Sequence, residues 1–102
     1  MNHGYLKSQY VSVSTTPYTV LSSDEILLVD SSSAAITVNL PAAADNDKRR
    51  LTIKDAGGQA GTNNITVDPN GAETIDGETT YLLDTNYESI DVVCDGTGWY
   101  IT

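Results

Sequence analysis

The chain is poor in the side chains that most often carry catalysis and metal binding. Its 102 residues include one His, one Cys, one Trp and no Phe. Because Cys94 stands alone, the chain can form neither an internal disulfide nor a thiolate metal site. A Ser-His-Asp or Cys-His arrangement would need the N-terminal His3 to be held against a nucleophile. Without a nucleophile-elbow or phosphate-loop motif, the sequence predicts no enzymatic activity.

Basic residues and long apolar runs are scarce as well. Five Lys and Arg residues stand against 14 Asp and Glu, which gives a net charge of −9. Such a charge repels nucleic-acid phosphates and anionic headgroups, so we expect neither nucleic acid nor a membrane as partner. No run reaches the roughly 18 apolar residues of a membrane span, and the N-terminus has no apolar signal core. We expect a soluble protein that is made in the cytoplasm.

Acidic residues are plentiful but form no recognisable site. Asp76 with Glu78, or Asp45 with Asp47, could act as a glycosidase pair, yet with 14 carboxylates such neighbours arise from composition alone. The segment Asp68-Pro69-Asn70-Gly71 resembles the opening of a calcium loop, but the later ligands and the closing acidic residue are missing. These side chains are expected to stabilise turns, and we expect no cofactor.

What the chain does contain is a series of short alternating phrases, each ended by a turn rich in Asp, Asn and Gly. Residues 35–40 show the pattern, with Ile36 and Val38 alternating with polar neighbours. We therefore predict an all-β fold, a compact β-sandwich or β-barrel of about nine or ten short antiparallel strands. The recurrence of Ile36-Thr37-Val38 as Ile65-Thr66-Val67 leaves a short β-helix as the alternative.

The pattern also divides the chain. Residues 1–8 have little periodicity and are expected to form an N-terminal arm, while residues 9–102 form a single β domain. Pro41 favours one helical turn at most in the segment that follows it. The Gly96-Thr97-Gly98 turn predicts a terminal hairpin. The residues assigned to the core are Trp99, Ile101, Ile53, Val67 and Val92.

Five of these phrases, taken in their order along the chain, resemble a known type of protein module. They are Leu40-Pro41-Ala42-Ala43, Thr52-Ile53-Lys54-Asp55, Asn64-Ile65-Thr66-Val67, Glu73-Thr74-Ile75-Asp76-Gly77 and Asp95-Gly96-Thr97-Gly98-Trp99-Tyr100-Ile101. As an ordered set they resemble a β module of tailed-bacteriophage virion structural proteins, which include head decoration (cement) proteins, tail fibres and tailspikes. The resemblance covers residues 35–102. It implies a homotrimer located in the virion.

Two functions compete within this resemblance, and a third lies outside it. A cement protein would bind the major capsid protein and stabilise the head from the capsid surface. A tail-fibre or receptor-binding module would instead present a glycan site. The chain begins with Met, has a short arm and contains no fibrous shaft, which favours the cement protein. The third candidate is a carbohydrate-binding β-sandwich, which predicts an exposed platform of Tyr or Trp side chains.

Candidate contact residues follow from residue type and strand position. Those expected to dock on the capsid or another partner are Tyr5, Leu6, Tyr10, Lys48, Arg49 and Arg50. The basic cluster would meet acidic groups of the partner, although it could equally offset Asp45 and Asp47 beside it. The residues expected at the subunit interface are Tyr81, Leu83 and Tyr87.

Overall fold

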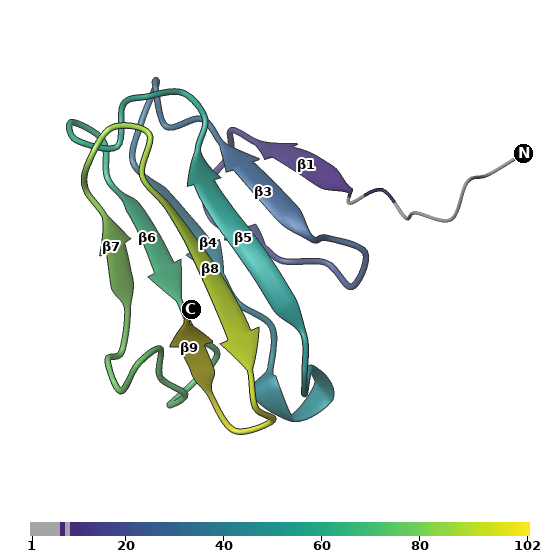
Figure 1. Cartoon of the computed structure of the whole chain (residues 1–102). Coiled ribbons are helices and arrows are strands. Elements are labelled where there is room, and N and C mark those ends of the chain that lie inside the picture. Colours follow the sequence, from purple (N-terminus) through teal and green to yellow (C-terminus); the bar gives the residue numbers. More distant parts are fainter. Residues whose placement is uncertain (1–6, 8) are drawn as a thin grey trace, which may run out of the picture.

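A computed structural model describes residue 7 and residues 9–102 of the chain. This described part contains nine strands and one short 3₁₀ helix (Figure 1). The strands are β1 (Tyr10–Val13), β2 (Tyr18–Thr19), β3 (Ile26–Val29), β4 (Ile36–Asn39), β5 (Arg50–Asp55), β6 (Ile65–Asp68), β7 (Tyr81–Leu83), β8 (Ser89–Cys94) and β9 (Trp99–Ile101). The helix is η1 (Ala43–Asp45), which confirms the single helical turn expected after Pro41.

The strands form two sheets. We name them sheet A, with strand order β1-β3-β5-β8-β9, and sheet B, with strand order β2-β4-β6-β7. The first six strands alternate between the sheets, and each one from β3 onward pairs in parallel with the strand two places earlier. The pairs made by β7, β8 and β9 are antiparallel. The chain thus winds through three successive coils and then reverses direction (Figure 1).

The all-β prediction is confirmed in its coarse form, but the expected antiparallel pairing is wrong for the pairs that the first six strands form with one another. Four of the seven strand pairs in the described part are parallel. Alternation of apolar and polar residues has the same period in both kinds of sheet, so it cannot distinguish them. Parallel neighbours need a crossover between them, and here each crossover contains a strand of the opposite sheet.

The repeated Ile-Thr-Val phrases show how the coil is built. Ile36, Thr37 and Val38 lie in register beside Ile65, Thr66 and Val67 on the neighbouring strands β4 and β6. Equivalent residues of successive coils therefore stack, with the isoleucines and valines buried and the threonines between them half-buried. This is the recurrence that left a short β-helix as the alternative. The parallel pairing extends over β1 to β6, after which the antiparallel strands β7, β8 and β9 end the coil.

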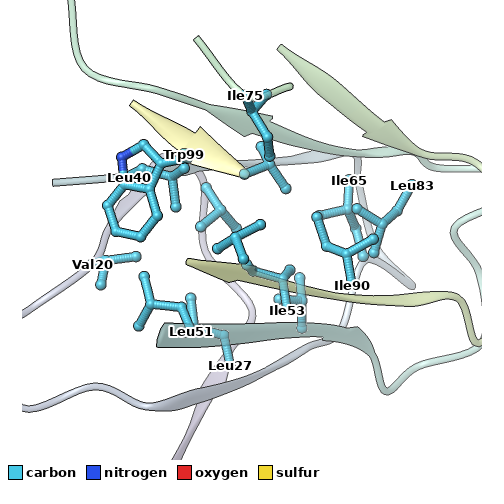
Figure 2. Close-up of a cluster of buried hydrophobic side chains, with 14 of the residues drawn as sticks. Val20, Leu27, Leu40, Leu51, Ile53, Ile65, Ile75, Leu83, Ile90 and Trp99 are labelled. Atoms are coloured by element: carbon cyan, nitrogen blue, oxygen red, sulfur yellow. The ribbon is translucent and has the colours of Figure 1, made fainter. Parts of the chain in front are cut away.

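Inward side chains of both sheets meet in one hydrophobic core (Figure 2). The predicted core residues Trp99, Ile53, Val67 and Val92 are all 0% exposed, which confirms their assignment. Ile101 is half-buried and packs against this core. Because Trp99 is fully enclosed, truncating its indole is expected to cost about 3–5 kcal/mol of folding free energy.

The predicted terminal hairpin is present as β8 and β9, with Cys94 opposite Trp99. Its turn is held by Asp95, whose carboxylate oxygen Oδ1 accepts the Thr97 and Gly98 N–H groups, each at 2.9 Å. The outer edge of β9 is also occupied. Trp99 N donates to the carbonyl of Thr74 at 2.9 Å, and the Asp76 N–H donates to the Trp99 carbonyl at 2.9 Å. The segment before β7 thereby covers this edge of sheet A.

Candidate functional site

The opposite edge of sheet A, along β1, has no neighbouring strand in the described part of the chain. The carbonyls of Gln9 and Val13 accept N–H groups of the β3 side, so the main-chain groups of Tyr10 and Ser12 face outward. Native proteins usually protect such edges with charged residues, proline or a bulge. No residue of 9–14 is charged or proline. As far as residues 7 and 9–102 are concerned, the β1 edge is therefore open to pairing with another strand.

A groove of about 490 Å³ lies beside this edge. We call it the β1 groove; it is lined by Gln9, Tyr10, Val11, Leu21, Ser23 and Asp24. Tyr10 is 67% exposed and Leu21 is 57% exposed, both high values for large apolar side chains. Across the sheet, Tyr10 is in register with Ile26, which is itself half-buried. Apolar surface is thus continuous from the groove onto β3, as is common at protein contact sites.

The loop that carries Leu21 is firmly held. The Asp24 carboxylate accepts the Tyr18 hydroxyl at 2.6 Å and the Leu21 N–H at 2.8 Å. The Arg49 guanidinium donates to the carbonyls of Leu21, at 2.7 Å, and Asp24, at 2.6 Å. Burial and the bond to Asp24 raise the pKa of Tyr18 to about 12. The wall of the β1 groove is therefore in place before any partner arrives, which lowers the entropic cost of binding.

The structure separates the three basic residues predicted to dock. Lys48 is exposed and pairs with Asp47 at 3.2 Å. Arg50 is exposed and donates to the Thr102 hydroxyl at 3.2 Å. Arg49 is half-buried, and its guanidinium is bonded within the chain to Asn46 as well as to the Leu21 loop. Docking therefore remains a prediction for Lys48 and Arg50, while Arg49 has a structural role that residue type alone did not reveal.

The three residues predicted at the subunit interface are also in different environments. Leu83 is 0% exposed and belongs to the core, so its assignment to an interface is wrong. The reason is the register of β7, which places Leu83 opposite Ile65 on the inward face of sheet B. Tyr81 is half-buried, and its hydroxyl donates to a Glu88 carboxylate oxygen at 2.9 Å, which raises the pKa of Tyr81.

Tyr87 is the member of that set whose ring is open to solvent, at 60% exposure. Its ring lies over Gly58, and the Lys54 ammonium is 5.6 Å from the ring centroid. Tyr10, predicted to dock, lines the β1 groove as described above. Tyr5 and Leu6, predicted with it, lie outside the described residues.

A second, polar pocket of about 440 Å³ lies where the parallel strands of sheet B end. The last residues of β2, β4 and β6 are Thr19, Asn39 and Asp68, which are aligned in register and line the pocket. The Asn39 amide donates to the Thr19 hydroxyl at 3.4 Å. Asn70 and Gly71 complete one wall. A hydroxyl, an amide and a carboxylate in one row are suited to hydrogen bonding with a hydroxyl-rich ligand.

Among residues 7 and 9–102, no group of three or more His, Cys, Asp or Glu side chains is placed to hold a metal ion. Over the same residues, no helix has both the length and the apolar composition needed to cross a membrane. In comparisons with known proteins, no protein-family model and no curated protein sequence matches the chain. The features of the chain that bear on its function are the resemblance of the ordered phrases and the two surfaces described above.

Proposed function

We propose that the chain is a structural protein of a bacteriophage virion, a cement protein that binds the capsid surface as a homotrimer and stabilises the head. The observation that carries this proposal is the β1 surface, which combines an uncharged open strand edge with a groove flanked by exposed Tyr10 and Leu21. A second copy of the chain is the partner assigned to this surface. Strand edges and apolar grooves of this kind bind extended protein segments.

Trimerisation and capsid binding would reinforce one another. A ligand that prefers the assembled shell lowers the free energy of that state by its binding free energy. Three linked copies would engage three capsid contacts at once, so modest contacts add up to a high avidity. Exposed Lys48 and Arg50 are the groups assigned to the major capsid protein, because the chain is otherwise strongly acidic. The protein would be made in the host cytoplasm and end on the virion.

Co-sedimentation with heads of the source phage tests this function. The wild-type chain is expected to pellet with heads, and the double variant Lys48→Glu/Arg50→Glu is expected to remain largely in the supernatant. The control is Thr79→Glu/Thr80→Glu, which adds two carboxylates at exposed positions just before β7 of sheet B. A wild-type trimer that never pellets with heads would move the assignment to the tail, and a monomer that ignores heads would refute the virion proposal.

The polar pocket supports a second candidate, a tail-fibre or receptor-binding module that recognises glycans. Its row of Thr19, Asn39 and Asp68 provides donors and acceptors on one side of a recess. Trp99 cannot belong to the Tyr or Trp platform expected of a carbohydrate-binding β-sandwich, because it is 0% exposed. Glycan-array binding that is abolished by Asp68→Ala, together with indifference to heads, would favour this candidate over the cement protein.

A further inference from the structure

Asn70 differs from the other asparagines of the described part in how its side chain is held. Each of the other five makes a side-chain hydrogen bond: Asn39 to Thr19, Asn46 to Ala42 and Arg49, Asn63 to Ser31, Asn64 to Ala60, and Asn86 to Gly61. The Asn70 amide makes none to any described residue. Asn70 is also the only asparagine of the sequence that is followed by glycine.

The turn around Asn70 is open. Asn70 and Gly71 are both exposed, and Gly71 has a φ of 56°. A Cβ built on Gly71 would meet no atom within 4 Å. The Asn70 side chain is therefore free to approach the main-chain nitrogen of Gly71, and no side chain on residue 71 obstructs that approach.

We propose that Asn70 is a self-modification site that deamidates in the folded protein. The main-chain nitrogen of Gly71 attacks Asn70 Cγ, so that an N–Cγ bond forms and the Cγ–Nδ2 bond breaks. Ammonia leaves and carries away the amide proton of Gly71. Water then opens the resulting succinimide ring at either carbonyl, which gives aspartate or isoaspartate at position 70. Either product adds a carboxylate to the polar pocket that Asp68 also lines.

The two products affect the fold differently. The Asn70 carbonyl accepts the Glu73 N–H at 3.0 Å, and the Glu73 carboxylate oxygens accept the Ala43 N–H at 3.1 and 3.2 Å. Isoaspartate inserts an extra methylene into the main chain immediately before Gly71. It therefore displaces the Asn70 carbonyl that holds Glu73, and with it the hydrogen bonds by which Glu73 links this loop to η1. Aspartate leaves the main chain unchanged and alters only the charge.

Peptide mapping by mass spectrometry tests the proposal on the full chain, incubated at mildly alkaline pH with and without urea. Deamidation adds about 1 Da to the peptide that contains the site. In the folded protein we expect this increase at Asn70 and at none of the five hydrogen-bonded asparagines, while in urea those sites convert as well. The incubation lasts as long as Asn70 takes to deamidate in the unfolded chain. If the Asn70 amide of the folded protein is still intact after that time, the proposal is overturned. Conversion of the other asparagines at an equal rate in the folded state would do the same.

The variant Asn70→Asp serves as the control for the structural consequence, because it carries the new charge on an unaltered main chain. Its thermal midpoint is expected to match that of the wild type. The isoaspartate fraction, separated by ion exchange, is expected to unfold at a lower temperature. Equal thermal midpoints for the isoaspartate fraction and Asn70→Asp would show that the hydrogen bonds of Glu73 do not depend on the main chain at residue 70.

Discussion

The main-chain N–H of Tyr87 donates a hydrogen bond of 2.8 Å to the carboxylate of Asp55, across 32 residues of sequence. The same carboxylate accepts the Gly58 N–H at 3.0 Å and the Ala60 N–H at 3.1 Å. Asp55 is itself 0% exposed. One buried side chain thus joins the loop between β5 and β6 to the loop between β7 and β8, and its charge is compensated by main-chain donors.

Removing this carboxylate leaves buried donors without a partner. We expect Asp55→Ala to lower the free energy of unfolding by about 3 kcal/mol or more, since each unsatisfied group costs about 1–3 kcal/mol. Urea unfolding followed by the fluorescence of Trp99, the single tryptophan, measures the change. The exposed Asp45→Ala is the matched control and should be nearly neutral. A loss below about 1 kcal/mol for Asp55→Ala would contradict this account.

Acidification should weaken the fold through the same group. Burial pushes the pKa of Asp55 upward, but the N–H groups of Tyr87, Ala60 and Gly58 outweigh burial and hold it below its usual value of 3.8. Because the pKa is lower in the folded state, the stabilisation is complete above the unfolded pKa and is lost as the pH falls through the folded pKa.

The expected result is a free energy of unfolding that decreases below about pH 4, with a shallower decrease in Asp55→Asn. Urea titrations at a series of pH values measure both slopes. Asp95 is a useful comparison, because the Gly98 and Thr97 N–H groups lower its pKa at an exposed position. Asp95→Asn should change the slope of the free energy of unfolding against pH less than Asp55→Asn does. Identical slopes for wild type and Asp55→Asn would show that Asp55 does not control the acid response.

Gly58 is required beneath the ring of Tyr87. A Cβ on residue 58 would lie 2.4 Å from the Tyr87 Cζ atom, and the φ of 72° is unfavourable for other residues. We expect Gly58→Ala to cost about 1–3 kcal/mol, measured by urea unfolding. The cost should fall in a Tyr87→Ala background, because the overlap is then removed.

Gly77→Ala isolates the backbone part of that cost. Its φ is 81°, and no atom lies within 4 Å of the added Cβ. It should destabilise the protein by less than Gly58→Ala. Additive effects of Gly58→Ala and Tyr87→Ala would rule out the steric explanation.

The features that sequence reasoning identified are local ones. The turn at Gly96 and the alternation around Trp99 were sufficient to predict the terminal hairpin and a buried indole, because both depend on neighbouring residues. The contacts of Asp55 with Tyr87 and of Arg49 with Leu21 join distant segments, and no spacing signals them. Leu83 was misassigned because a leucine on an alternating strand fits a core or an interface equally well until the pairing of β7 is known.

Arg49 and Lys48 are adjacent, but the structure predicts that replacing them has effects of different size on stability. Arg49→Ala removes charge-assisted bonds to the carbonyls of Leu21 and Asp24, so we expect a loss of about 2 kcal/mol in the free energy of unfolding. Lys48→Ala removes one exposed ion pair and should change it by less than about 0.5 kcal/mol. Urea unfolding of both variants checks this, and equal effects would mean that the Arg49 bonds do not hold the loop.

The β1 surface should control self-association without controlling the fold. Tyr10→Ser and Leu21→Ser remove apolar side chains that are 67% and 57% exposed, so the folded monomer loses little, whereas a partner packed on the β1 groove loses its anchors. If the wild type forms the proposed trimer, we expect both variants to shift its sedimentation-velocity profile toward the monomer, while the urea midpoint stays near that of the wild type. The control is Leu82→Ser on β7, a leucine that is 43% exposed on sheet B, away from the groove. If Leu82→Ser dissociates the assembly as strongly as Tyr10→Ser does, the contact does not lie at β1 and the sheet B surface becomes the interface.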